Sequence, residues 1–179
     1  ATFDGYRAGS VLEIPGARAV SIEFVSFSKT YNMAGWRLGA TVGSAAIIRS
    51  LLQVKSNMDS GHFHPIYDAG IVAVDTTTQD WTDARNALNA RRRDKVLQAL
   101  PDLGLKAQVP KGALYIWARV EEGDGTAYAR AALEEAHVSL GPGGAYGPGG
   151  HDYVRLSLTL PDAQIDEALH RLRVWHANR

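Results

Sequence analysis

The sequence predicts an α/β protein made of two parts. Short runs of β-branched and aromatic residues alternate with helical patterns along the whole chain. A long pattern near residues 80–100 is polar on most of its faces, which is typical of a helix that bridges two domains. The first part lacks enough strands to close a sheet of its own, whereas the second could form a complete small α+β domain.

The first part is predicted to contain two strands and two helices. Residues 1–20, punctuated by glycine and proline, are expected to be loop, and Ser28–Met33 is expected to be a polar turn. The regular elements follow from β-branched runs and from apolar residues at helical spacing: a buried strand over Val20–Phe27, a strand over Arg37–Val42, and helices over Ala45–Val54 and Pro65–Val74.

The second part begins with the long polar helix, Asp80–Leu100, which Pro101 and Gly104 close. Its other elements are expected to be strands over Leu105–Val109, Ala113–Val120, Val138–Leu140 and Tyr153–Leu158, helices over Thr126–Ala136 and Pro161–Trp175, and a glycine-rich loop over Gly141–Gly150. We therefore expect an incomplete domain over residues 1–78, an inter-domain helix over 79–100 and a small domain over 101–179.

Composition excludes several classes of function. Lys+Arg and Asp+Glu are both 19, so no global field favours nucleic acid or an anionic membrane. No apolar stretch reaches the roughly 18 residues of a spanning helix. The absence of cysteine excludes disulfides and cysteine nucleophiles and suits the cytoplasm. His62 and His64 lack the carboxylate spacing of a metal site, so no metal is expected, and Arg91–Arg93 is interpreted as a solvated helix face.

The segment Ser26–Gly39 carries the strongest chemical signal. A strand delivers Lys29 into a turn, and Arg37 follows eight residues later between Gly35 and Gly39. A lysine at the end of a buried strand is partly desolvated, which favours the neutral, nucleophilic amine. Two nearby serine hydroxyls and the guanidinium fork of Arg37 suit a phosphate group.

This segment resembles the cofactor-lysine signature of class I/II aminotransferases, the fold-type I enzymes that use pyridoxal 5'-phosphate. The resemblance implies that the chain is the C-terminal part of the large α/β domain plus the α+β small domain. It also implies that Lys29 carries pyridoxal phosphate as a Schiff base and that Arg37 and Ser26 bind its phosphate. Ser28 either joins them or caps the turn.

A second stretch resembles the same family near the C-terminus. Gly141–Gly147 is similar to its Pro-Gly-rich loop, with Tyr146 where the family usually has Phe. The stretch His151–Ser157 is similar to the strand with an arginine that follows this loop, and in the strand Tyr153–Leu158 alternation points Arg155 away from Val154 and Leu156. The resemblance implies that Arg155 binds the substrate α-carboxylate, and the alternative is a solvent-facing arginine. Tyr31 and Trp36 are expected to pack in the core.

The function that the resemblance implies is transfer of an amino group from an amino acid to a 2-oxo acid by a homodimer. The segment Lys55–Gly61 is most similar to the LL-diaminopimelate and aspartate aminotransferase-like branch. The family's pyridine-binding Asp and ring-binding Tyr precede the lysine, and Asp4 stands in the wrong place to be that Asp. We therefore expect a truncated chain, opening at Ala1, that is inactive alone. A β-lyase and a cofactor-free, non-catalytic fragment are the alternatives.

Overall fold

The structure is a computed structural model of residues 1–179 and divides into two compact units. The C-terminal unit joins Ala1–Tyr6 to Asp83–Arg179, and the N-terminal unit comprises Arg7–Thr82. The first six residues therefore belong with the C-terminal unit, whereas the sequence suggested a single first part over residues 1–78. No helix in either unit combines the length and the apolar run that crossing a membrane requires.

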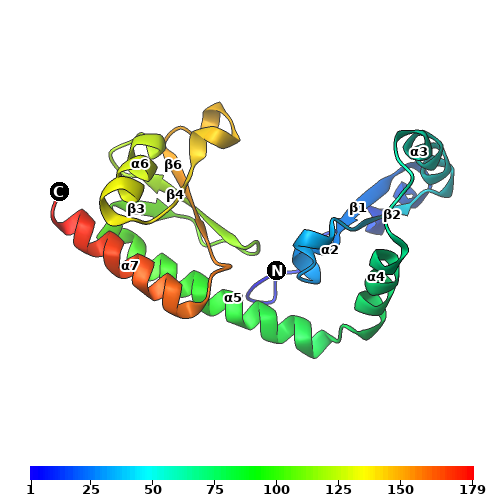
Figure 1. The fold of residues 1–179 in the computed structure, drawn as a ribbon, viewed down its shortest axis with the longest axis horizontal. Helices are drawn as coiled ribbons and strands as arrows, with labels where there is room; N and C mark the ends of the chain where they lie inside the picture. Colours follow the sequence, from blue (N-terminus) through cyan, green and yellow to red (C-terminus); the bar gives the residue numbers. More distant parts are fainter. The chain divides into compact units, whose positions relative to one another are not determined.

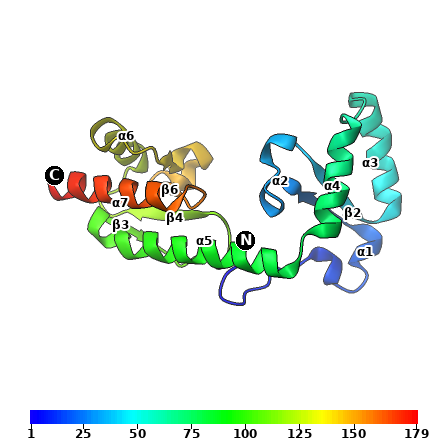
Figure 2. The ribbon, with the colours of Figure 1, turned by 60° about the horizontal axis from the view of Figure 1, so that its bottom comes forward.

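The C-terminal unit is a four-stranded antiparallel sheet with helices packed on one face (Figures 1 and 2). The strand order is β3-β4-β6-β5, so β4 and β6 are central. The elements of this unit, with α5 starting just before its boundary, are α5 (Gln79–Ala99), η3 (Leu100–Leu103), β3 (Leu105–Ala107), β4 (Tyr115–Val120), α6 (Gly125–Ala136), β5 (Gly141–Pro142), η4 (Gly143–Tyr146), η5 (Pro148–Gly150), β6 (Tyr153–Ser157) and α7 (Asp162–Ala177).

Strand alternation places the core of this unit on the helical face of the sheet. Ile116 and Ala118 of β4 and Val154 and Leu156 of β6 are buried there with apolar residues of α5, α6 and α7. The Tyr128 hydroxyl, at the rim of the core, donates a hydrogen bond to the Leu103 carbonyl at 2.8 Å. The opposite face of the sheet is consequently free of α-helices.

The first six residues pack against α5 and the loop after β3. Thr2 forms an isolated β-bridge with Gly112, and the Phe3 side chain is 3% exposed. Arg93 of α5 is also buried, its guanidinium 2.6 Å from the Asp4 carboxylate and 4.9 Å from the Phe3 ring centre. The interpretation of Arg91–Arg93 as a solvated face is therefore wrong for Arg93, because the N-terminal segment covers it.

The N-terminal unit contains a two-stranded antiparallel sheet and two longer helices. Ser26 at the end of β1 pairs with Gly39 at the start of β2, so residues 27–38 form the connection between the strands. The elements are η1 (Val11–Glu13), α1 (Ala17–Val20), β1 (Ile22–Ser26), α2 (Phe27–Thr30), η2 (Ala34–Trp36), β2 (Gly39–Gly43), α3 (Ala45–Met58) and α4 (His64–Thr76).

Four expectations from the sequence are wrong in detail. The strand near Val20–Phe27 forms but is not buried, since only β2 pairs with it and Phe24 is 72% exposed. The turn expected over Ser28–Met33 begins inside the helical turn α2. Val138–Leu140 is not a strand, because His137 ends α6 in the left-handed conformation and the Val138 N–H bonds back to α6. Pairing starts only at β5. Residues 1–20, expected to be loop, also include η1 and α1.

Candidate functional site

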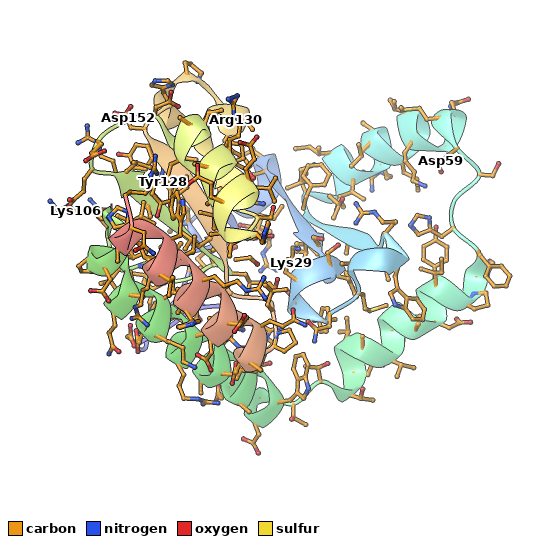
Figure 3. All side chains as sticks on the ribbon, turned by 60° about the vertical axis from the view of Figure 1, so that its left-hand side comes forward. Lys29, Asp59, Lys106, Tyr128, Arg130 and Asp152 are labelled. Carbon is orange, nitrogen blue, oxygen red and sulfur yellow. The ribbon has the colours of Figure 1, made fainter.

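Lys29 lies on α2, the single helical turn that follows β1 (Figure 3). The turn forms here because the Ser26 side chain caps it, accepting a hydrogen bond from the Ser28 N–H at 3.2 Å. The expectation of a partly desolvated lysine is wrong for this chain, in which the Lys29 side chain is exposed. What the fold supplies at Lys29 is a fixed backbone position at the end of a strand.

Ser26, Ser28 and Arg37 converge at the same end of the β1–β2 pair. The Phe27 N–H bonds to the Leu38 carbonyl at 3.1 Å, which holds the two ends of the connection together. The Arg37 guanidinium donates to the Ala34 carbonyl at 2.9 Å and, in a long contact of 3.5 Å, to the Ser28 hydroxyl. The sequence-predicted phosphate residues are thus neighbours in the structure, and Ser26 rather than Ser28 is the cap.

The backbone of Arg37 adopts an uncommon conformation. Its φ is 53° and its ψ is 38°, in the left-handed region that costs a non-glycine residue about 1 kcal/mol. The His62 imidazole lies 2.7 Å from the Arg37 carbonyl through Nε2 and bonds to it. His62 in turn stacks on Tyr67, with ring centres 5.6 Å apart at 17°. Sequence reasoning missed this support, because the contact spans 25 residues and no motif signals it.

A small apolar core holds the connection in place. Phe27, Met33 and Leu38 are buried against α4, and Leu38 immediately follows Arg37. Gly70 of α4 permits this approach, since a Cβ there would lie 2.4 Å from the Leu38 side chain. Tyr31 packs on this cluster as predicted, whereas Trp36 is 47% exposed and does not belong to the core. The cluster ties the positions of Lys29 and Arg37 to α4.

The donor set of this region fits a phosphorylated aldehyde cofactor. Arg37 contacts a carbonyl and a hydroxyl but no carboxylate, so its positive charge is not neutralised within the chain. A guanidinium and two serine hydroxyls are suitable donors for phosphate oxygens, and a lysine amine is the group that condenses with an aldehyde. The fit therefore rests on the residues Ser26, Ser28, Lys29 and Arg37 together.

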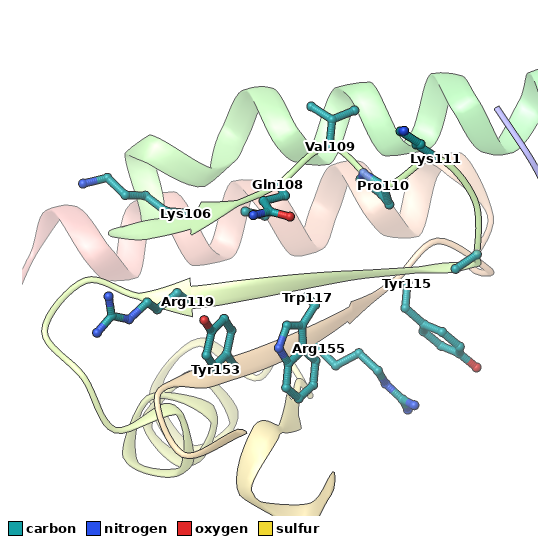
Figure 4. Close-up of a pocket in the computed structure, with 12 residues that line it drawn as sticks. Lys106, Gln108, Val109, Pro110, Lys111, Tyr115, Trp117, Arg119, Tyr153 and Arg155 are labelled. Atoms are coloured by element: carbon teal, nitrogen blue, oxygen red, sulfur yellow. The ribbon is translucent and has the colours of Figure 1, made fainter. Parts of the chain in front are cut away.

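Arg155 lies in the C-terminal unit, on the face of the sheet that no α-helix covers. Its neighbours Val154 and Leu156 are buried on the other face, as the alternation predicted. A cavity of about 930 Å³ lies over this face, and Figure 4 shows the side chains of β4 and β6 that point toward it. Its lining combines aromatic and cationic residues, including Tyr115, Trp117, Arg119, Tyr153 and Arg155.

The charge on Arg155 is not compensated by an acidic partner. Two other cations of the cavity are paired, Lys106 with Glu121 at 2.7 Å and Arg119 with Asp152 at 3.3 Å. Arg155 instead lies against two aromatic rings, 4.2 Å from the ring centre of Tyr115 and 4.8 Å from that of Tyr146. An uncompensated arginine on a hollow surface is suited to binding a carboxylate.

These features define a class of protein: a lysine beside a phosphate-type cradle, and an unpaired arginine on an aromatic sheet face, on an α/β scaffold. Comparison with known families agrees with this. The family model described as aminotransferase class I and II matches residues 12–172. The chain therefore belongs to the class I and II aminotransferase family, whose members depend on pyridoxal phosphate.

Individual relatives give the same result. The chain is 45% identical over 171 residues to an LL-diaminopimelate aminotransferase of Dehalococcoides mccartyi, and 46% identical over 172 residues to one of Desulforudis audaxviator. These alignments cover 95% and 96% of the chain but 44% of each relative. The chain thus spans less than half the length of these curated relatives.

Solved structures are similar over the same extent. The aspartate aminotransferase of Rhizobium meliloti matches with a TM-score of 0.86 and 28% identity, covering 98% of this chain and 47% of that one. The aromatic aminotransferase of Pyrococcus horikoshii matches with a TM-score of 0.89 and 28% identity, covering 99% of this chain and 48% of that one. The fold expected from the sequence is confirmed.

Proposed function

We propose that this chain forms part of a pyridoxal-phosphate-dependent aminotransferase that transfers an amino group from an amino acid to a 2-oxo acid. Because the chain spans 44% of the length of its relatives, the activity is proposed for a polypeptide that also carries the remainder of the family's length. In this proposal, residues 7–78 belong to the cofactor-binding domain, 79–100 to the inter-domain helix and 101–179 to the small domain, with which residues 1–6 are packed.

The observation that carries the proposal is the cluster at the β1–β2 connection. The cap formed by Ser26 sets the helical turn on which Lys29 lies, and Arg37 joins the same cluster through Ser28. Arg37 has a full positive charge without a carboxylate partner, which favours an external anion such as a phosphate ester. A solvated surface lysine would require none of these arrangements.

Each residue has a distinct role in the proposed reaction. When bound, pyridoxal phosphate supplies the electron sink that stabilises negative charge at the substrate Cα. Arg37, Ser26 and Ser28 hold the phosphate, and the Lys29 amine provides the covalent attachment. The Lys29 Nζ would also be the base that accepts the substrate Cα proton and the acid that delivers this proton to the cofactor, as transamination requires. Arg155 would hold the α-carboxylate, which orients the Cα–H bond and lowers the entropic cost of reaching the transition state.

We further propose substrates and assembly from the relatives. Two of the most similar relatives are named for LL-diaminopimelate, so this amino acid is the first donor to assay. A homodimer and a cytoplasmic location are proposed from the family resemblance and the cysteine-free composition. Sedimentation equilibrium would test the dimer, and cell fractionation would test the location.

A ¹⁵N transfer assay tests the reaction. A polypeptide that carries this chain together with the remainder of the family's length is supplied with pyridoxal phosphate, ¹⁵N-labelled LL-diaminopimelate and 2-oxoglutarate, and labelled glutamate is measured by mass spectrometry. The proposal predicts labelled glutamate with the wild type and none with Lys29→Ala. Release of free ¹⁵N-ammonia without labelled glutamate would contradict transamination and favour a lyase on the same scaffold.

A further inference from the structure

Arg155 lies against two aromatic rings. The Tyr115 ring, from the neighbouring strand β4, lies 4.2 Å from the guanidinium carbon, and the Tyr146 ring, from η4, lies 4.8 Å from it. Contacts of this length are within the range of cation–π attraction. We infer that Tyr115 and Tyr146 form an aromatic clamp that positions the Arg155 guanidinium for a carboxylate. This inference rests on the proposed role of Arg155.

The clamp is itself supported by further packing. Trp117 meets the Tyr146 ring edge-on, with ring centres 5.6 Å apart at 82°. Trp117 also stacks on Tyr153, with centres 5.3 Å apart at 12°. Tyr146 is 53% exposed, so its position is not fixed by burial. The ring of Tyr146 therefore contacts both Trp117 and Arg155.

Gly141 provides the space in which the clamp closes. It pairs with Arg155 across the β5–β6 register. A Cβ at this position would lie 3.2 Å from the Tyr146 hydroxyl and 3.3 Å from the Arg155 Cβ. Both distances are tighter than most Cβ contacts in proteins, so a side chain at Gly141 would push one member of the pair aside.

Rings position the arginine without using its hydrogen-bond donors. A guanidinium is planar and its N–H groups point outward in that plane, so rings that contact its faces leave the donor edge available. A carboxylate partner would hold Arg155 equally well but would occupy the same N–H groups that a substrate carboxylate needs. The absence of an acidic partner and the presence of two rings are together what a carboxylate-binding arginine requires.

Succinate binding to this chain tests the clamp. Binding is measured by isothermal titration calorimetry, which reports on every variant including Arg155→Lys. The Arg155 Nε–H signal is observed by NMR, and Arg155→Lys identifies it by removing it. The order parameter of the same ¹⁵Nε reports how firmly the side chain is held. Tyr115→Leu and Tyr146→Leu remove one ring each, Tyr146→Phe retains the ring, and Tyr6→Leu is the control, since Tyr6 is an exposed tyrosine that contacts Lys111 instead. Thermal unfolding verifies that each variant folds.

The clamp predicts that each leucine variant lowers the Arg155 order parameter and weakens succinate binding about 2- to 5-fold. Tyr146→Phe and Tyr6→Leu should both behave as the wild type. If Arg155→Lys abolishes binding while the leucine variants bind and order Arg155 as the wild type does, the clamp is refuted and the proposed role of Arg155 stands. If Arg155→Lys binds succinate as tightly as the wild type, the carboxylate role fails and the clamp fails with it.

Discussion

The loop that carries Tyr146 depends on a very close approach between two glycines, and a single methyl group should disrupt it. A Cβ at Gly150 would lie 2.1 Å from the carbonyl oxygen of Gly143, which is about 1.3 Å short of ordinary contact. The clashing atom belongs to the backbone, so no side-chain rotation can relieve it. Gly150→Ala therefore requires a backbone shift in the segment that leads into η4.

The cost can be estimated from overpacked cores, where an added methylene destabilises by about 1–3 kcal/mol. For a chain of this size, 1 kcal/mol corresponds to about 2–4 °C in Tm. Gly149 is the matched control, because a Cβ there meets nothing within 4 Å. Gly149→Ala should leave stability unchanged or raise it by about 0.4–1 kcal/mol through the unfolded state.

Thermal unfolding followed by Trp fluorescence measures the difference, since a Cβ at Gly150 would also lie 3.3 Å from the Trp117 ring. We predict that Gly150→Ala lowers the Tm by about 4–8 °C, which corresponds to a destabilisation of about 2 kcal/mol. Gly149→Ala should cause no decrease in Tm. Equal Tm values for the two variants would refute the close approach of the two backbone segments and, with it, the stated position of η4.

Three further predictions concern hydrogen bonds elsewhere in the fold. Burial raises the pKa of Tyr128 to about 12. The stability contributed by its neutral hydroxyl should therefore be complete below pH 10 and lost as the pH rises through about 12. In urea unfolding at alkaline pH, Tyr128→Phe should not show this loss of stability. The hydrogen bonds from Arg93 lower the pKa of Asp4. This pair should therefore stabilise the folded chain at pH values above the usual carboxyl pKa of 3.8, and the stabilisation should be lost as the pH falls below it. In acid unfolding, Asp4→Asn should not show this loss of stability. His62→Ala should release the Arg37 carbonyl and weaken pyridoxal phosphate binding about 3- to 10-fold, for a hydrogen bond of about 1 kcal/mol, as measured by absorbance titration; unchanged affinity would contradict the support role.

Periodicity predicted the elements that alternate or repeat strongly. The strand β6 and the helix α7 were both expected within two residues of their ends, because their apolar residues follow a single period. The face of Arg155 followed from the same alternation. These successes share a cause: in the C-terminal unit each strand is buried on one face, so the pattern in the sequence records the burial directly.

Periodicity could not predict which surfaces other segments cover. Phe24 lies in a run of apolar residues that is typical of a buried strand, yet its side chain is 72% exposed. Such a run identifies a strand but does not tell which segments cover it. Arg93 shows the opposite error: its burial depends on Phe3 and Asp4, about 90 residues away. Non-local contacts of this kind leave no trace in local sequence patterns.

The candidate site was predicted as a set of residues rather than as a geometry. The fourteen-residue signature located Lys29 and Arg37, and the structure shows how they are held. The left-handed backbone of Arg37, its bond to His62 and the rings against Arg155 all arise from tertiary contacts. Motifs specify the groups that act, whereas the surrounding contacts that orient them become visible only in three dimensions.

The most direct test of the central claim is borohydride reduction of the protein after incubation with pyridoxal phosphate, followed by peptide mass mapping. The chain provides internal comparisons: the other lysines are Lys55, Lys95, Lys106 and Lys111, and the adjacent Asp59 carboxylate raises the pKa of Lys55, which disfavours its reactive amine. The account predicts a phosphopyridoxyl group on Lys29 above all others, and loss of that selectivity in Arg37→Gln. Labelling spread evenly over the lysines, or selectivity that survives Arg37→Gln, would contradict it.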